Sequence, residues 1–203
     1  MRTVTQTFNV YTFDELKEDM KRKVLDDFRD INVDNEWYEF VYDDFIASVK
    51  EKYGVQLLYD NISFSGFWCQ GDGASFIVEF DDKEMAALLD KFDISFRYGL
   101  KKTFIDTIYK CEIRRNEFMY YNAGTVSPNI ELNVVWLGPH LQKYIEKKAD
   151  EFYEKLENWK DELCSKLYKM LDDEYTNLTS DELVIETIID NNYEFYETGE
   201  QYV

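Results

Sequence analysis

The chain has few of the residues that build metal centres, disulfide frameworks and catalytic triads. It contains three cysteines and one histidine in 203 residues. Cys69, Cys111 and Cys164 are odd in number and far apart, which argues against a disulfide framework and against a zinc site, because both need closely spaced pairs. We interpret them as buried or inert free thiols, and His140, next to Pro139, as a surface residue at a helix start. We therefore expect no metal and no cofactor.

Long apolar runs and flexible linkers are also missing. No run of 18 apolar residues occurs, so no transmembrane helix is expected, and residues 1–6 lack the apolar core of a signal peptide. Two prolines and eight glycines leave little material for linkers. The sequence therefore predicts a cytoplasmic protein without membrane contact.

Basic residues are scarce, and one stretch has none. There are 23 Lys and Arg against 42 Asp and Glu, a formal net charge of −19. Binding to nucleic-acid phosphates needs an excess of Lys and Arg, so direct contact with DNA or RNA is not expected. Residues Met170 to Val203 contain ten acids and no Lys, Arg or His. Uncompensated charge opposes compactness, so we hypothesise that this segment meets a basic protein surface.

What the chain does have is enough apolar and aromatic material for a core, in a pattern that predicts an α+β fold. Hydrophobic residues make up 45% of the chain and aromatic residues 17%. The pattern predicts an antiparallel sheet of four to five strands with helices packed on it and one long helix in the C-terminal half. Strands are expected at 3–11, on both sides of Gly71-Asp72-Gly73 within 61–80, at 107–113, at 130–136 and at 193–196. Helices are expected at 13–30, 36–52, 83–92, 140–173 and 183–190.

The break at Gly138-Pro139 predicts two parts. Residues 1–138 would form an α+β core domain, and residues 139–203 the long helix with an acidic C-terminal segment packed on the core or projecting from it. The apolar positions of the long helix recur at partly heptad spacing, which leaves a homodimer through this helix open.

A second acidic surface is expected on the helix that starts at Glu36, since helical spacing puts acids on the face opposite its apolar residues. No base occurs from Val33 to Val49. A solvated helix face is the simpler interpretation. Together with the C-terminal acids, this face gives the candidate partner-binding residues: Glu36, Glu39, Asp43, Asp44, Asp172, Asp173, Glu174, Asp181, Glu182 and Glu186.

The loop from Trp68 to Ser75 is the one place where the sequence suggests chemistry. Its conspicuous residues are Trp68, Gln70 and Asp72, whose role the sequence leaves unknown. Asp72 could ligate a metal and Cys69 could act as a nucleophile, but a thiolate needs a nearby base and none is visible. A structural turn, with glycines at positive φ, is the simpler interpretation. No catalytic residue is assigned.

The segment Ile62–Phe76, with the sequence ISFSGFWCQGDGASF, resembles a motif in a largely uncharacterised family of small proteins encoded by phages and prophages. The segments 11–16 and 178–182 are similar to that family's flanking segments. A further aromatic segment matches in part, at Tyr120, Tyr121 and Thr125. Relatives tend to carry histidine there, whereas Phe118 and Asn122 stand in this chain, which argues against a histidine-dependent site. The resemblance implies no catalytic residues.

The charge and this resemblance together suggest a non-enzymatic inhibitor of a host defence nuclease, of the anti-CRISPR or anti-restriction kind. Its carboxylates would imitate the charge of DNA and occupy a basic nucleic-acid-binding groove. Two alternatives stay open. One is a metal-dependent or hydrolytic enzyme that uses the Trp68–Ser75 loop, and the other is a phage assembly protein.

Overall fold

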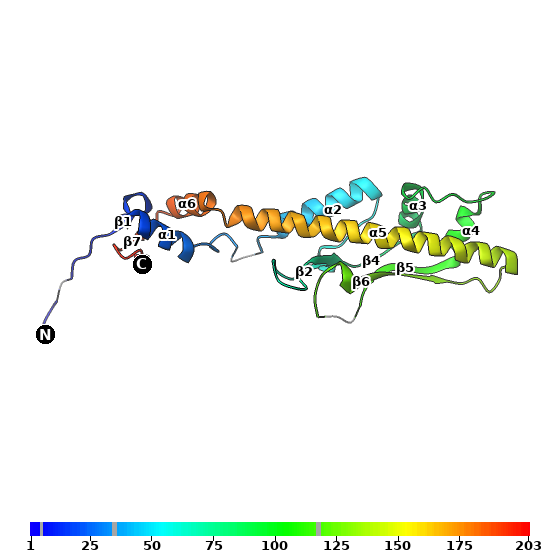
Figure 1. Cartoon of the computed structure of the whole chain (residues 1–203), viewed down its shortest axis with the longest axis horizontal. Helices are drawn as coiled ribbons and strands as arrows, with labels where there is room; N and C mark the ends of the chain where they lie inside the picture. Colours follow the sequence, from blue (N-terminus) through cyan, green and yellow to red (C-terminus); the bar gives the residue numbers. More distant parts are fainter. Residues whose placement is uncertain (5, 34–35, 117–118) are drawn as a thin grey trace. The chain divides into compact units, whose positions relative to one another are not determined.

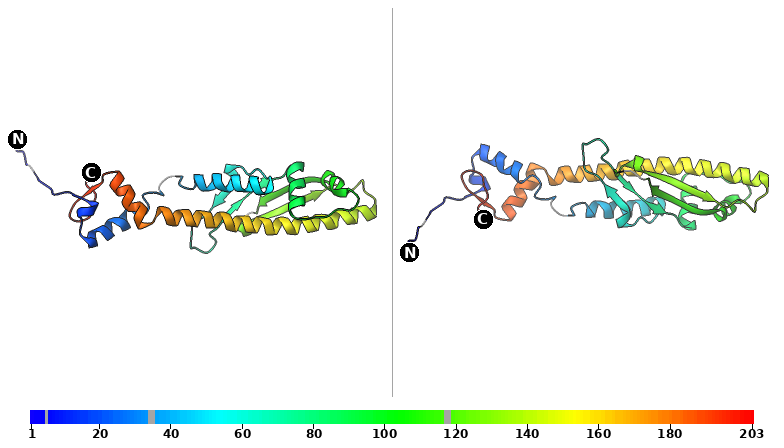
Figure 2. Two further views of the ribbon diagram at one scale, coloured as in Figure 1. Left: turned by 90° about the horizontal axis from the view of Figure 1, so that it is seen from above. Right: turned by 90° about the horizontal axis from the view of Figure 1, so that it is seen from below.

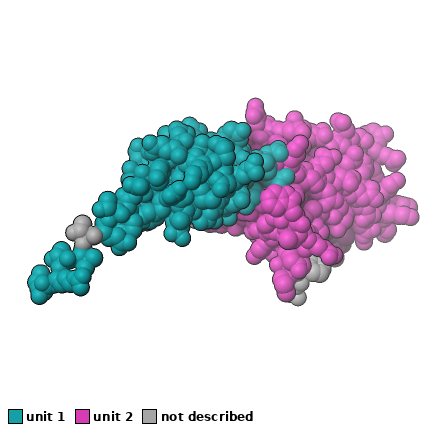
Figure 3. Space-filling view, turned by 60° about the vertical axis from the view of Figure 1, so that its left-hand side comes forward, with its two compact units in different colours: residues 1–39, 172–203 teal, residues 40–171 magenta. Residues whose placement is uncertain are grey.

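The computed structural model describes residues 1–203 except residues 5, 34–35 and 117–118 (Figure 1). The chain forms two compact units, shown in different colours in Figure 3: unit 1 comprises Met1–Glu39 and Asp172–Val203, and unit 2 comprises Phe40–Leu171. The expected division at residue 138 therefore differs from these units. The reason is that the long helix does not form a separate part, since most of it packs into the core of unit 2.

Unit 2 is a layer of helices on a small antiparallel sheet. In the three ribbon views α2 and α5 run side by side over one face of β4, β5 and β6 (Figures 1 and 2). The helices are α2 (Glu39–Tyr53), α3 (Asp82–Lys91), α4 (Leu100–Thr107) and α5 (Pro139–Leu178), the last of which continues into unit 1. The strands are β2 (Ile62–Phe64), β3 (Ala74–Phe76), β4 (Val78–Glu79), β5 (Ile108–Arg115) and β6 (Val126–Leu132), with 3-10 turns at Tyr59–Asn61 and Ala123–Thr125.

The predicted α+β class, the antiparallel pairing and the long C-terminal helix are confirmed. The strands of the described residues, however, are divided among sheets of two, two and three strands, in the orders β1-β7, β2-β3 and β4-β5-β6. The division inside unit 2 occurs at Ile77, between β3 and β4, where the chain changes partner. Its N–H donates to the Asn61 carbonyl at 3.0 Å, after which Val78 pairs with Ile113.

The strand expected at 130–136 lies earlier in the chain. β6 ends at Leu132, opposite Ile108, because α4 occupies the residues that precede β5 and leaves no further partner. The Asn133 N–H donates to the Thr107 carbonyl at 2.7 Å and closes the ladder. Trp136, which the alternating pattern placed in the strand, is 59% exposed. The pattern also gave no sign of α4 itself.

The apolar stripe of the long helix α5 is buried against other parts of the same chain. Ile145, Phe152, Leu156, Leu163 and Leu167 are all buried. A stripe that is already buried cannot also form a coiled-coil seam. A homodimer through α5 would need another surface, and it stays a prediction.

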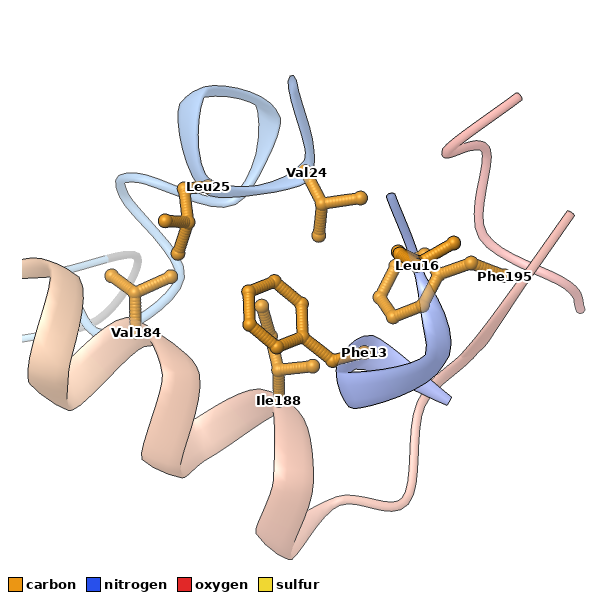
Figure 4. Packing of buried hydrophobic residues seen from close by; sticks show 7 residues of the cluster. All are labelled: Phe13, Leu16, Val24, Leu25, Val184, Ile188 and Phe195. Carbon is orange, nitrogen blue, oxygen red and sulfur yellow. The ribbon is translucent and has the colours of Figure 1, made fainter. Parts of the chain in front are cut away.

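Unit 1 joins the two ends of the chain around a small apolar core. Its elements are β1 (Tyr11–Thr12), a 3-10 turn (Phe13–Glu15), α1 (Glu18–Asp27), α6 (Asp181–Asp190) and β7 (Glu194–Phe195). Figure 4 shows side chains of α1 and α6 facing one another, with Phe13 between them. The buried cluster consists of Phe13, Leu16, Val24, Leu25, Val184, Ile188 and Phe195.

Two predicted elements of unit 1 are much shorter than expected. The strand at 3–11 is reduced to Tyr11–Thr12, which pairs with β7. Upstream of it, Val4 and Phe8 are exposed, because their alternation meets no partner strand among the described residues. The helix expected at 13–30 is split, since the Thr12/Glu15 capping box closes only a 3-10 turn before α1 begins at Glu18.

Candidate functional site

The acidity of the chain is concentrated in unit 1. This unit holds about a third of the residues, with twenty acids and six bases and therefore a formal net charge of −14. Unit 2 holds 22 acids and 17 bases, a net charge of −5. The described acids of unit 1 are exposed apart from Asp172 and Glu174, which are half-buried. A folded scaffold thus holds a dense set of carboxylates in water.

Several bases of unit 1 are already occupied by its own acids. Lys17 forms an ion pair with Glu197 at 2.9 Å, which raises the pKa of Lys17 and lowers the pKa of Glu197 through a hydrogen bond and charge attraction. Arg29 forms ion pairs with Asp181 and Asp26, and its pKa is also raised, chiefly by the hydrogen bond to Asp181. These contacts tie the acidic C-terminal segment to the N-terminal one. Among the described acids of unit 1, Glu182, Glu186 and Asp190 of α6 form no ion pair with a base.

The predicted partner-binding residues fall into both units. Glu36, Glu39, Asp172, Asp173, Glu174, Asp181, Glu182 and Glu186 belong to unit 1, whereas Asp43 and Asp44 belong to unit 2. The expected stripe on one helix is wrong at its start, because α2 begins at Glu39 and Glu36 precedes it. The buried face of that helix is confirmed at Val41, Phe45 and Val49. Glu36, Glu39, Asp43 and Asp44 are all exposed.

Helix α1 adds acids to unit 1 that the sequence alone does not mark as part of an acidic surface. Glu18, Asp19, Asp26 and Asp27 lie on α1 and are exposed. In the sequence they surround the basic run 21–23, so this stretch looks charge-balanced. Only the packing of α1 against the base-free C-terminal segment shows that they belong to one acidic unit.

A pocket in unit 1 combines an apolar floor with carboxylates. It measures about 250 Å³ and is lined by Thr12, Phe13, Asp14, Ile188, Ile189, Asn192, Tyr193 and Glu194. Phe13 and Ile188 are buried, whereas Asp14 and Glu194 are exposed and bear the charge. Such a pocket suits the apolar stem and cationic head of a Lys or Arg side chain.

The Trp68–Ser75 loop is held by its own polar groups. The Asp72 carboxylate accepts a hydrogen bond from the Cys69 N–H at 2.7 Å, so it closes the turn. Asn122 donates its side-chain amide to the Gly71 carbonyl at 2.8 Å and joins the loop to the segment after β5. Ser75 is buried, while Cys69 and Gln70 are exposed. These contacts agree with a structural turn.

Trp68 stands out in this loop because its ring is exposed and its backbone is unusual. It is 73% exposed and has a φ of +66°, a conformation that L residues rarely adopt. Across the described ranges, no group of three or more His, Cys, Asp and Glu side chains is placed to hold a metal ion. Phe118, one of the two positions at which the sequence resemblance leads us to expect histidine, lies outside the described residues.

Replacing Gly73 with alanine is expected to destabilise unit 2 by roughly 1–3 kcal/mol, as overpacking does. A Cβ at this position would lie 2.5 Å from the Asn122 Cβ and 2.9 Å from its Cα, and the second of these atoms is backbone. Urea denaturation measures the loss. Gly138→Ala is the matched control, because no atom lies within 4 Å of its added Cβ. Equal stability of the two variants would show that the loop does not need this close approach.

The fold and this surface define a class of protein: a two-unit α+β chain in which a strongly acidic unit accompanies a nearly balanced one. By sequence, the chain belongs to a family described as a domain of unknown function, DUF8835, which matches residues 37–181. The matched range contains the whole of unit 2 together with residues 37–39 and 172–181 of unit 1, so most of unit 1 lies outside it. No curated protein and no solved structure is significantly similar to this chain. None of the helices in the described ranges has the length and apolar character needed to cross a membrane.

Proposed function

We propose that the protein is a non-enzymatic inhibitor of a host defence nuclease, of the anti-CRISPR or anti-restriction kind, and that unit 1 occupies the nuclease's basic nucleic-acid-binding groove. The observation that carries this proposal is the formal net charge of −14 on about a third of the chain. Duplex DNA presents one charge per about 1.7 Å of axis, and a groove that attracts it also attracts a dense set of carboxylates.

The folding of unit 1 supports this proposal. A charged surface gives speed and selectivity to association, while affinity depends on a few well-packed anchors. Both features are present in unit 1, since α6 exposes Glu182, Glu186 and Asp190, and the pocket beside Asp14 and Glu194 can receive a basic side chain. Such an inhibitor would act in the host bacterial cytosol, where the nuclease meets foreign DNA.

Charge reversal on α6 is expected to abolish protection of a phage against a host defence system. The variant is Glu182→Lys, Glu186→Lys and Asp190→Lys, all at exposed positions. The measurement is the plating efficiency of a sensitive phage on bacteria that carry a restriction or CRISPR system and express the protein. Purified nucleases from the same systems then report DNA cleavage at rising protein concentration. Loss of inhibition by at least tenfold is expected, and inhibition should weaken as salt screens the charges.

A matched control variant distinguishes an effect of the acids on α6 from an effect of the total net charge. Asp106→Lys, Asp150→Lys and Glu154→Lys change the same number of exposed acids in unit 2, so the two variants have equal net charge. Inhibition by this control should stay within about twofold of the original, because it leaves unit 1 intact. If both variants lose inhibition equally, the surface of unit 1 is not the contact. If the unaltered protein protects against none of the systems, the proposed function is wrong.

A further inference from the structure

Unit 2 has an open cavity at its surface that is lined by three exposed lysines from three helices. It measures about 610 Å³, within the range of small-molecule sites. Lys52 and Lys91 stand in the last turns of α2 and α3, and Lys155 lies within α5. Lysine at a helix C-terminus is favoured by the helix dipole, which accounts for two of the three. It does not account for Lys155.

The charge balance of this cavity is positive, in a chain that is strongly acidic. Three lysines and two acids line it, and one of the acids, Asp161, forms an ion pair at 2.6 Å with Lys160, which is not part of the lining. Among the described residues, neither Lys91 nor Lys155 forms an ion pair. Lys91 and Lys155 are thus two exposed ammonium groups beside one cavity, and both attract an anion.

The remaining walls are aromatic and include one side-chain amide. Tyr53, Phe92 and Trp159 line the cavity, and the Tyr53 and Trp159 rings meet edge to face with centroids 5.6 Å apart. The side-chain amide of Asn158, also at the cavity, can both donate and accept hydrogen bonds. The walls thus suit a flat ring with polar edges.

We propose that this cavity binds a mononucleotide, with its phosphate at Lys91 and Lys155 and its base against Tyr53 and Phe92. The volume exceeds what a lone phosphate needs, and ammonium groups are strong point-charge partners for phosphate. The aromatic walls supply the surface on which a base packs. The site lies in unit 2, so it does not depend on the proposed role of unit 1.

Isothermal titration of the whole protein with AMP, UMP, adenosine and inorganic phosphate tests this site. At least one nucleotide should bind, and adenosine and inorganic phosphate should each bind at least tenfold more weakly than that nucleotide. The variant Lys91→Gln with Lys155→Gln should lose at least tenfold in affinity. Lys83→Gln with Lys102→Gln is the control, since both lysines are exposed and lie outside the cavity.

Three results would overturn the site. They are no binding of either nucleotide at millimolar concentration, equal affinity in the two double variants, and inorganic phosphate binding as tightly as the nucleotides. The last result would reduce the cavity to a general anion site. Circular dichroism of each variant confirms that it is folded. The nuclease-inhibition assay is also run on the variant Lys91→Gln with Lys155→Gln. Its inhibition should be unchanged, so failure of the nucleotide site and failure of the proposed nuclease inhibition can be told apart.

Discussion

Replacing Phe195 with alanine is expected to unfold unit 1 while unit 2 stays folded. Phe195 has no exposed surface, belongs to the buried cluster of unit 1 and meets the Phe28 ring edge to face at 5.8 Å. Truncating a buried Phe to Ala costs about 3–5 kcal/mol. A unit with so small a core has little more stability than that to lose. The acidic surface would then lose the scaffold that holds its carboxylates in place.

Hydrogen exchange read by mass spectrometry measures this loss segment by segment. Peptides from α1 and α6 should lose protection, and peptides from the part of α5 in unit 2 should keep it. Tyr202→Ala is the control, since that ring is 46% exposed and lies at the same end of the chain. Nuclease inhibition should fall with Phe195→Ala, whereas nucleotide binding should remain. Equal loss of protection in both units would show that they unfold together.

One thiol per molecule is expected to react quickly with a disulfide reagent at pH 8, and the other two only when the protein unfolds. Cys69 is exposed, while Cys111 and Cys164 are buried. Burial raises the pKa of both buried thiols to about 12, and the charge of Glu112 adds to the effect at Cys111. The thiolate is the reactive form, so the two buried groups stay protonated and shielded. Cys69→Ser should remove the fast reaction, and three thiols of equal rate would contradict the burial.

The same two thiols predict a loss of stability at alkaline pH. Their pKa values rise from 9.0 in the unfolded chain to about 12 in the fold, so the folded state holds these protons more tightly. Their contribution is complete below pH 9 and is lost as the pH rises toward 12, by roughly 4 kcal/mol per thiol at most. Urea denaturation from pH 8 to 11 measures it. Replacing both cysteines with alanine should flatten the decline, and an unchanged decline would assign it to other groups.

Local patterns in the sequence predicted the elements that depend on local periodicity. The apolar stripe of α5, the buried face of α2 and the hairpin around Gly71-Asp72-Gly73 are confirmed. Each of these rests on spacings of two to four residues along one stretch of chain, which the sequence displays directly. The excess of acids is likewise a property of composition.

Elements that depend on a distant partner were not predictable in the same way. The strand alternation at 130–136 was clear, yet β6 ends at Leu132 because its partner β5 begins where α4 stops. The segment 3–11 alternates as well, but only Tyr11 and Thr12 find a strand to pair with. Alternation shows that a segment can form a strand, and pairing decides whether it does.

By itself, the sequence determined the α+β class, the long helix, the small supply of catalytic side chains and the strong acidity of this protein. Only the tertiary structure decided which acids lie together in one unit and which lysines lie together at one cavity. Unit 1 joins the acids of α1 to the base-free C-terminal segment, and unit 2 brings Lys52, Lys91 and Lys155 to one cavity. The physical reason is that charge acts through space, whereas the sequence orders residues only along the chain.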